Sequence, residues 1–196
     1  MVRDSEIVAG KYRIEGVLGT GGMGVVFAAT HLDLDRRVAV KVMRAEMVEH
    51  PSAVERLVLE AKLAARFKSE HVCKVLDVGT MPDGVPYIVM EYLEGADLAS
   101  LLAEAGAFDI VTAVDFMLET CEALAEAHSA HIVHRDLKPE NLFAAKDLDG
   151  SVSIKVLDFG ISKQVGAISN SSSRSLTNPS SALGSPYYMA PEQMRS

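Results

Sequence analysis

The sequence predicts an α+β fold in two parts, in which a small antiparallel sheet with one helix precedes a mainly helical region. Three short β-prone runs fill most of the chain up to Met43, and a helix and a hairpin follow them. From residue 110 to residue 128, apolar side chains recur at helical spacing. We therefore expect residues 1–91 to form the first part, residues 92–95 a hinge and residues 96–196 the second part.

The composition is that of a globular chain and excludes several classes of partner. Its 196 residues are 48% hydrophobic and 23% charged, with a formal net charge of -8. Nucleic-acid duplexes and anionic membrane surfaces select basic faces, so neither is expected as a partner. No apolar run reaches the roughly 18 residues of a membrane span, and the N-terminus lacks the apolar core of a signal peptide. We expect a soluble, cytoplasmic protein whose two cysteines, Cys73 and Cys121, are buried reduced thiols.

The residues LGTGGMGVV at 18–26 place three glycines in a GxGxxG frame. Such a loop exposes backbone N–H groups to an anion, which suits either a dinucleotide or the phosphates of ATP. In a dinucleotide-binding fold the last glycine opens a helix. Here Gly24 is followed by VVFAAT, which is β-branched and aromatic and has no helix start signal. The pattern therefore favours strand, loop and strand.

A second signal is Lys41, which interrupts the apolar run VAVKVM at residues 38–43. A lysine on an edge strand discourages aggregation. A lysine that a strand holds beneath the glycine loop binds phosphates instead. This segment by itself favours neither interpretation.

Two helices and a hairpin complete the predicted elements. Residues 50–67 show helical spacing, with Ser52 and Glu55 placed as a capping box and Glu60 on the same helix. Residues 72–93 hold two β-prone runs around the turn MPDG, which predicts a hairpin. The long second helix is indicated by its apolar positions Val114, Met117, Leu118, Cys121, Leu124 and Ala125.

The residues with the strongest chemical signal follow the long helix. In IVHRDLKPENLF, Asp136 stands five positions before Asn141, and in SIKVLDFG a second aspartate, Asp158, follows an apolar run. Phosphoryl transfer needs a carboxylate to orient the acceptor hydroxyl, oxygen ligands for magnesium, and cations that neutralise charge. The sequence supplies all of these residue types. Taken by itself, Asp158 would be interpreted as a turn-forming aspartate before Gly160.

The motifs GTGGMGVV, VAVK, HRDLKPEN, DFG and APE occur in the order typical of protein kinases. Over nearly its whole length the chain resembles a serine/threonine protein kinase, in particular the bacterial eukaryotic-like kinases. The resemblance implies a protein-kinase-like two-lobe fold, with an N-lobe of antiparallel sheet plus one helix and a mainly helical C-lobe. The C-lobe would be incomplete, because the chain ends four residues after Glu192. Part of the helix 110–128 should then expose an uncovered apolar face.

The resemblance also implies which residues bind the phosphates of ATP. Gly19, Gly21 and Gly24 would form the loop over them. Lys41 would hold the α- and β-phosphates, oriented by an ion pair with Glu60. In this context the phosphate-binding interpretation of Lys41 is preferred over the edge-strand one.

Around the adenine, Met90 would be the gatekeeper, and the backbone of Glu91 and Leu93 would face the adenine edge. Val26 would lie above the ring, and Phe143 would lie beneath it in place of the usual aliphatic residue. The implied nucleotide-binding set, with Asp97 near the ribose, is Leu18, Gly19, Thr20, Gly21, Gly22, Met23, Gly24, Val26, Ala39, Lys41, Met90, Glu91, Leu93, Asp97 and Phe143.

Four residues of the later region are implied to carry the chemistry. Asp136 would accept the proton of the substrate hydroxyl, and Lys138 would stabilise the transferring phosphate. Asn141 and Asp158 would hold the magnesium ions. The loop KPEN resembles those of serine/threonine rather than tyrosine kinases. The implied cofactors are ATP and Mg²⁺, and the implied substrates are proteins.

A regulatory interpretation depends on Arg135, which directly precedes Asp136. A phosphate on the activation loop would give this arginine a bidentate partner. The serine-rich residues 167–185 supply the candidate sites, and Thr177, Ser180 and Ser181 are preferred among them. Self-association for autophosphorylation is the partner interaction that this implies.

Two other functions stay open on the sequence alone. A nucleotide-binding scaffold without transfer is suggested by the early end of the chain and opposed by intact Lys41, Asp136 and Asp158. A nicotinamide-dependent oxidoreductase depends only on the GxGxxG frame and is opposed by the β-prone run after Gly24. One local departure from the family is His131, which stands at a helix end where glycine is common, so left-handed strain is expected there.

Overall fold

The computed structural model describes residues 5–22, 24–49, 51–147, 149–159 and 186–194, with no description of the side chains of residues 51–53, 56, 60 and 186. Internal contacts divide the chain into two compact units. Unit 1 comprises residues 1–66 and 73–93, and unit 2 comprises residues 67–72 and 94–196. The segment 67–72 therefore belongs with the later part of the chain, although its first residue was predicted to be the last residue of the first helix.

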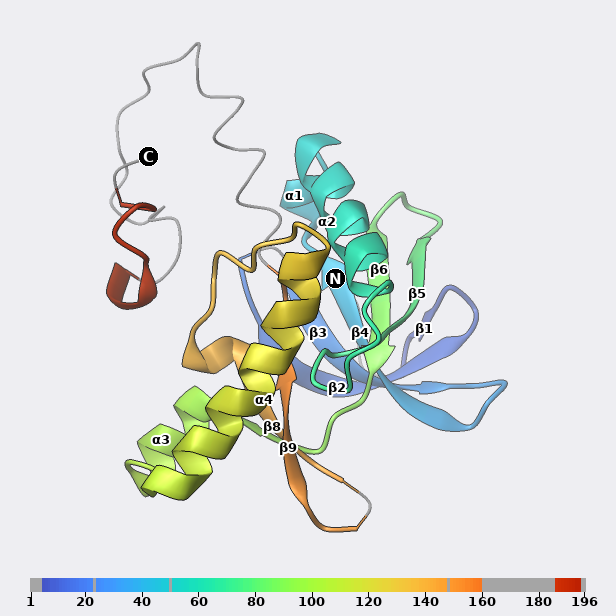
Figure 1. The fold of residues 1–196 in the computed structure, drawn as a ribbon. Helices are drawn as coiled ribbons and strands as arrows, with labels where there is room; N and C mark the ends of the chain where they lie inside the picture. The colour runs from blue at the N-terminus through green and yellow to red at the C-terminus, as the bar shows by residue number, and fades with distance from the viewer. Residues whose placement is uncertain (1–4, 23, 50, 148, 160–185, 195–196) are drawn as a thin grey trace. The chain divides into compact units, whose positions relative to one another are not determined.

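Unit 1 is built on a six-stranded antiparallel sheet with the order β1-β2-β3-β4-β6-β5 (Figure 1). Its strands are β1 (Ile7–Val8), β2 (Tyr12–Thr20), β3 (Gly24–His31), β4 (Arg36–Met43), β5 (Val75–Thr80) and β6 (Pro86–Glu91). β-branched residues are frequent in β3 and β4, which pair over their whole length. Because β4 lies between β3 and β6, Lys41 is on an inner strand, and the edge-strand interpretation is wrong.

Among the described residues, two apolar clusters stabilise unit 1. The first lies against the sheet, where alternate residues of β2, Tyr12 and Ile14, are buried with residues of β1, β3, β4 and β6. The second joins the helix α2 (Pro51–Ala64) to the sheet through Leu57, Ala61 and Ile88. Burial of one face of the helix, rather than propensity alone, is what holds a helix of this length in place.

The helical part of unit 1 begins earlier than predicted. A one-turn helix, α1 (Ala45–Val48), precedes α2 and was not predicted. Helix α2 starts at Pro51, whose missing N–H suits a first helical position. The predicted capping box is therefore wrong, because Ser52 lies inside the first turn and not ahead of it.

Gly24 lacks a side chain for a packing reason. A Cβ at this position would lie 2.3 Å from the carbonyl oxygen of Val42 on β4. Gly24→Ala should therefore lower the free energy of unfolding by about 1–3 kcal/mol, because β3 and β4 must separate locally. Gly22→Ala is the matched control, since a Cβ there meets no atom within 4 Å, and it should change this free energy by at most about 0.5 kcal/mol. Urea denaturation measures both, and equal losses would contradict the close approach.

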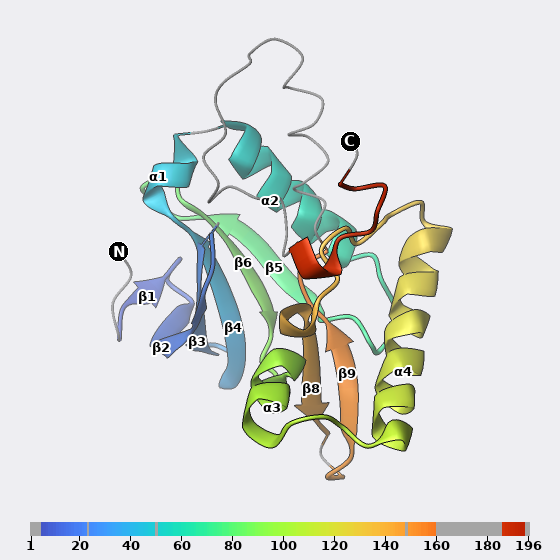
Figure 2. The ribbon, with the colours of Figure 1, turned by 90° about the vertical axis from the view of Figure 1, so that its left-hand side faces the viewer.

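In the part of unit 2 that the structure describes, two helices combine with a small antiparallel sheet that the sequence analysis did not predict (Figures 1 and 2). Its sheet has the order β7-β8-β9, and both helices contact it, α3 through β7 and β8 and α4 through β9. The elements within its described residues are β7 (Gly95–Asp97), α3 (Leu98–Ala105), α4 (Ile110–Ser129), β8 (Leu142–Lys146), β9 (Val152–Val156) and 3₁₀ turns at Pro139–Asn141 and Pro186–Tyr188.

The segment 67–72 is held in unit 2 through its backbone. The N–H groups of Lys68 and Ser69 donate to the two carboxylate oxygens of Glu126 on α4, each at 2.8 Å. Val72 forms a parallel bridge with the last residue of β9. A carboxylate that accepts two backbone bonds is a strong, charge-assisted anchor for so short a segment.

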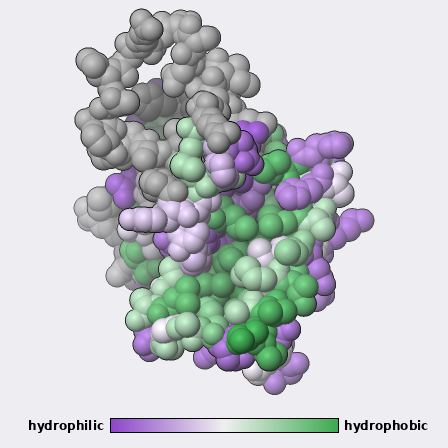
Figure 3. Space-filling view, turned by 60° about the vertical axis from the view of Figure 1, so that its left-hand side comes forward, coloured by the Kyte–Doolittle hydropathy of each residue, from purple (hydrophilic) through white to green (hydrophobic). Residues whose placement is uncertain are grey.

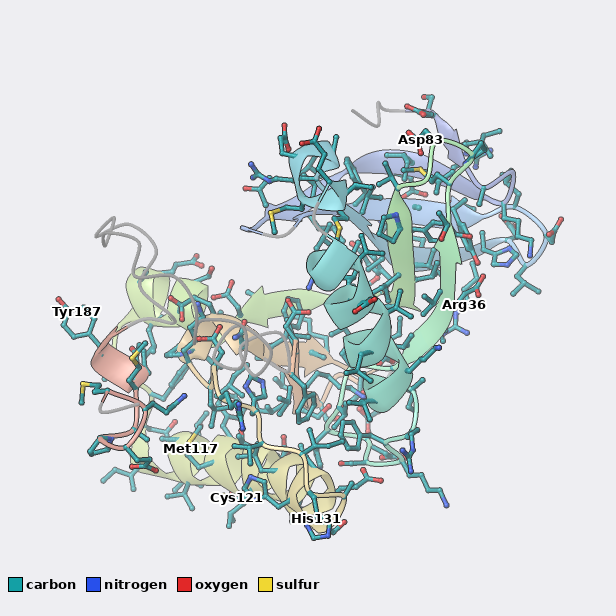
Figure 4. All side chains as sticks on the ribbon, turned by 90° about the horizontal axis from the view of Figure 1, so that it is seen from above. Arg36, Asp83, Met117, Cys121, His131 and Tyr187 are labelled. Atoms are coloured by element: carbon teal, nitrogen blue, oxygen red, sulfur yellow. The ribbon has the colours of Figure 1, made fainter. Side chains whose placement is uncertain are left out.

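Helix α4 has a buried side and an exposed apolar side. Thr120, Ala123 and Ala127 are buried, and small residues there allow close packing within unit 2. The other side lines an apolar groove. Figure 3 shows apolar residues on this exposed surface, and Figure 4 labels two residues of α4 on its outward side, Met117 and Cys121. The predicted uncovered apolar face is confirmed by the exposed residues Ile110, Val111, Val114, Met117 and Leu118.

The cysteine prediction is correct for one residue and wrong for the other. Cys73 is buried, whereas Cys121 is exposed. The physical reason is that Cys121 lies on the outward side of α4, beside Met117 (Figure 4). An apolar neighbourhood in sequence did not distinguish the covered side of the helix from the uncovered one.

The ends of α4 follow the rules for helix termini. The Asp109 carboxylate accepts bonds from the N–H groups of Val111 and Thr112, as an N-cap does. After the last helical residue, Ser129, His131 has a φ of 59°, so its predicted left-handed conformation is confirmed. In the part of the chain that the structure describes, no helix has both the length and the apolar character needed to cross a membrane.

Candidate functional site

Asp136, Lys138 and Asn141 lie together on the loop between α4 and β8. The Asp136 carboxylate oxygen Oδ2 is 3.8 Å from Lys138 Nζ and 3.4 Å from Asn141 Nδ2. Asn141 Nδ2 also donates to the Asp136 carbonyl oxygen at 2.8 Å. The 3₁₀ turn at Pro139–Asn141 makes this approach possible over five positions of sequence.

Asp158 follows β9 and is connected to the same loop. The N–H of Leu157 donates to the Asn141 carbonyl at 2.9 Å, and the Leu157 carbonyl lies 2.9 Å from His134 Nε2. Asp158 is exposed and has a φ of 41°. Aspartate tolerates this left-handed conformation better than most residues, at some cost in strain. Gly160 lies outside the described residues, so the turn interpretation of Asp158 stays open.

Sequence reasoning missed two buried rings that support this loop. His134 is 2% exposed, and its Nδ1 accepts the N–H of Asp136 at 3.3 Å, so its Nε2 carries the proton donated to Leu157. Phe159 is equally buried, with ring centroids 4.9 Å from His134 and 4.8 Å from Phe67. The sequence signal that could have identified these two rings is their position close to the two predicted aspartates.

A third missed contact joins the APE segment to the same loop. Gln193 Nε2 donates to the Arg135 carbonyl at 3.0 Å, while Gln193 Oε1 accepts the N–H of Ala190 at 3.1 Å. Arg135 itself has a φ of 63°. Arg135 on this loop and Asp158 after β9 thus both have a left-handed conformation. Strain of this kind is concentrated at functional sites.

The predicted phosphate-binding residues are distributed over three neighbouring strands of unit 1. Lys41 is 9% exposed and pairs with Val26 on β3 and with Ile88 on β6. Met23 and the side chain of Glu60 lie outside the described residues, so the ion pair between Lys41 and Glu60 stays a prediction. Of the predicted nucleotide-binding residues in this region, Leu18, Gly19 and Thr20 lie on β2, Gly24 and Val26 on β3, and Ala39 and Lys41 on β4, while Gly21 and Gly22 lie between β2 and β3.

The glycines of the loop lack side chains for different reasons. Gly24 approaches β4 closely, whereas a Cβ at Gly19 or Gly22 would meet no atom within 4 Å. Neither of these two has a left-handed φ, so the backbone alone would accept other residues there. The open space beside them suits a ligand. A strand, and not a helix, follows Gly24, so the dinucleotide interpretation is wrong.

The predicted adenine-binding backbone lies at the end of β6, with Met90 and Glu91 on the strand and Leu93 after it. The N–H of Glu91 donates to the Lys74 carbonyl at 3.0 Å, and its carboxylate accepts the N–H of Lys74 at 2.8 Å. The N–H of Glu91 is therefore engaged within unit 1. A ligand edge that needs a backbone donor would therefore not find one at Glu91.

Asp97 has a structural role that the sequence analysis did not identify. It is the N-cap of α3, and its carboxylate accepts the N–H of Ser100 at 2.9 Å and the Ser100 hydroxyl at 2.7 Å. Burial acts to raise the pKa of Asp97, but the hydrogen bonds from Ser100 outweigh it and hold the pKa below the ordinary value. Phe143, on β8, pairs with Asp97 across the small sheet.

The family model of the protein kinase domain matches residues 12–196 of the chain. The chain belongs to the protein kinase family. It is 38% identical over 192 residues to the probable serine/threonine-protein kinase PknB of Corynebacterium glutamicum, covering 96% of this chain and 28% of that protein. It is 39% identical over 188 residues to the serine/threonine-protein kinase pkn3 of Myxococcus xanthus, covering 96% of this chain and 34% of that protein.

Among solved structures, the chain is similar to the PknI kinase domain of Mycobacterium tuberculosis, with a TM-score of 0.70 and 28% identity. The match covers 82% of this chain and 64% of that domain. The predicted kinase-like two-lobe fold is thereby confirmed, with unit 1 built as an N-lobe and unit 2 as part of a C-lobe. The chain spans about a third or less of the length of the curated relatives named above.

Proposed function

We propose that this protein kinase chain transfers the γ-phosphoryl group of ATP to serine and threonine hydroxyls of protein substrates. The observation that carries the proposal is the convergence of Lys138 and Asn141 on the carboxylate of Asp136, in a loop bonded to the strand end before Asp158. The sequence identity of this chain to relatives described as serine/threonine kinases supports serine and threonine over tyrosine as acceptors.

In this proposal Asp136 orients the acceptor hydroxyl and takes its proton. Lys138, 3.8 Å from that carboxylate, places a positive charge beside the group that is transferred. Asn141 uses its amide nitrogen on Asp136, which leaves its amide oxygen for a magnesium ion, and Asp158 adds an exposed carboxylate. These oxygen donors fit magnesium. When bound, ATP with magnesium supplies the phosphoryl group.

The nucleotide-binding part of the proposal concerns mainly residues of unit 1, with Asp97 and Phe143 from unit 2. Lys41 would hold the phosphates, with Glu60 as its partner, and the open space at Gly19 and Gly22 would admit the phosphates to backbone N–H groups. The adenine would lie among Val26, Ala39, Met90, Leu93 and Phe143, with Asp97 near the ribose.

Transfer of labelled phosphate from γ-labelled ATP tests the function. With magnesium and serine-, threonine- and tyrosine-containing acceptor proteins, we expect label on serine and threonine and none after chelation of magnesium. Lys41→Met, which keeps the side-chain length in a 9% exposed position, should abolish transfer, whereas the exposed control Lys11→Met should not. Nucleotide binding without transfer, by this chain and by a version lengthened to a whole kinase domain, would favour a scaffold instead.

Asp97 allows capping and ribose binding to be separated. Asp97→Ala should lower the free energy of unfolding by about 1 kcal/mol, whereas Asp97→Asn keeps a capping oxygen and should leave it nearly unchanged at neutral pH. If the carboxylate binds the ribose, both variants should weaken nucleotide binding.

The pKa of Asp97 in the folded state lies below the ordinary value of 3.8. The stabilisation by its carboxylate is therefore present above that value and is lost as the pH falls through the folded-state pKa.

Urea denaturation at about pH 7 and about pH 3, together with nucleotide titration, checks these expectations. Asp97→Asn should make the loss of stability between these two pH values smaller than in the unchanged chain, because it removes the contribution of Asp97. Equal destabilisation by the alanine and asparagine variants at neutral pH would contradict the capping role.

Regulation by phosphorylation of the activation loop is also part of the proposal. Arg135 stands directly before Asp136, and a phosphate would give its guanidinium a bidentate partner. The candidate sites Thr177, Ser180 and Ser181 lie outside the described residues. Mass spectrometry of active protein should find phosphate in residues 167–185 after incubation with ATP, and an unmodified loop in active protein would remove the idea.

A further inference from the structure

The side chain of Glu15 is directed by an irregularity in the sheet. The pairing of β2 with β3 shifts between Ile14 and Gly16, which leaves Glu15 as the extra residue of a bulge. Bulges turn a side chain away from the regular alternation of a strand. The Glu15 carboxylate accepts bonds from the Thr30 hydroxyl and, at 3.1 Å, from Arg37 Nε.

Thr30 and Arg37 are themselves paired across β3 and β4, so three strands contribute to this contact. The hydrogen bond from Thr30 is the main cause that holds the pKa of Glu15 below its ordinary value, against the opposing effect of burial and with help from the charge of Arg37. Glu15 is therefore ionised at neutral pH and remains a partner for Arg37.

The other contact of Arg37 reaches the connection after β6. Its guanidinium carbon lies 4.0 Å from the centroid of the Tyr92 ring. Tyr92 stands between Glu91 and Leu93, the two residues whose backbone is expected to face the adenine. The bond from Nε fixes one edge of the planar guanidinium, which leaves its face for the ring.

We propose that Arg37 is a positioning residue for nucleotide binding: held by Glu15, it fixes Tyr92 and with it the backbone from Glu91 to Leu93. The inference rests on the proposed function, because it assumes that this backbone binds the adenine. A surface ion pair with no such role would contribute little to stability and nothing specific to nucleotide affinity. Both side chains of the pair are partly exposed, at 49% for Arg37 and 32% for Glu15, so a modest effect is expected.

The test compares Arg37→Gln with Arg36→Gln, an exposed neighbour on the same strand (Figure 4). Arg37→Gln should raise KM for ATP and the Kd of a fluorescent ADP analogue about two- to fivefold, the range of an exposed cation–π contact. The kcat and the KM for the protein substrate should not change. Tyr92→Leu should raise both constants to a similar extent. Arg37→Lys should raise them too, because lysine keeps the charge but lacks the planar face.

Amide hydrogen exchange of residues 91–93, measured without nucleotide, gives a readout independent of catalysis. Exchange should be faster in Arg37→Gln than in Arg36→Gln. Equal exchange and equal nucleotide affinity in these two variants would overturn the proposal, and full retention by Arg37→Lys would overturn the stacking. If neither this chain nor its lengthened version transfers phosphate, the proposed function fails, while the exchange comparison still decides whether Arg37 fixes this backbone.

Discussion

Asp136→Asn should lower the rate of phosphate transfer about 10²- to 10⁴-fold while leaving nucleotide affinity almost unchanged. An amide at this position cannot take the proton of the acceptor hydroxyl. The loop should keep its shape, because Asn141 Nδ2 bonds to the backbone carbonyl of residue 136 as well as to its side chain. The effect is thus expected in kcat and not in the Kd of ATP.

Steady-state transfer assays and nucleotide titrations on the same preparations measure these two quantities. Asp149→Asn is the matched control, because Asp149 is exposed in the turn before β9 and bonds locally to Ser151. A kcat for Asp136→Asn within a few-fold of the control would remove Asp136 from the role of base.

Phe159→Ala should lower the free energy of unfolding by about 3–5 kcal/mol, the cost of emptying a large buried aromatic site. The ring is 2% exposed and contacts both His134 and Phe67, so two neighbours lose their packing at once. Phe67 lies on the segment 67–72, so the damage should extend to that segment's attachment within unit 2.

Urea denaturation checks the value, with Tyr187→Ala as the control of similar size. Tyr187 is 92% exposed, so its truncation should change the free energy of unfolding by at most about 0.5 kcal/mol. Phe159→Leu should lie between the two. Equal losses for the Phe159→Ala and Tyr187→Ala variants would mean that the ring of Phe159 does not stabilise the fold.

The features predicted correctly from the sequence are those encoded by nearby residues. Asp136 and Asn141 are five positions apart, and a single 3₁₀ turn is enough to bring them together. The β-branched run after Gly24 gave β3 directly, because strand propensity and the missing helix start signal agreed. The helix end at His131 was also predicted correctly, because it too is encoded by nearby residues.

What the sequence did not predict depends on contacts between distant positions. Gln193 meets the carbonyl of Arg135 across 58 positions, and Glu126 anchors Ser69 across 57. No local pattern encodes such pairs. The strands β7, β8 and β9 were missed because strands of three and five residues carry little periodicity.

The route of the chain affects any attempt to divide this protein. The polypeptide passes between the two units after residues 66, 72 and 93, so no single cut yields either unit whole. A gene fragment that stops at Leu93 would produce the segment 67–72 without Glu126 or β9, leaving two backbone N–H groups to water. Split versions of this kinase would therefore need the second fragment to recapture a peptide carried by the first.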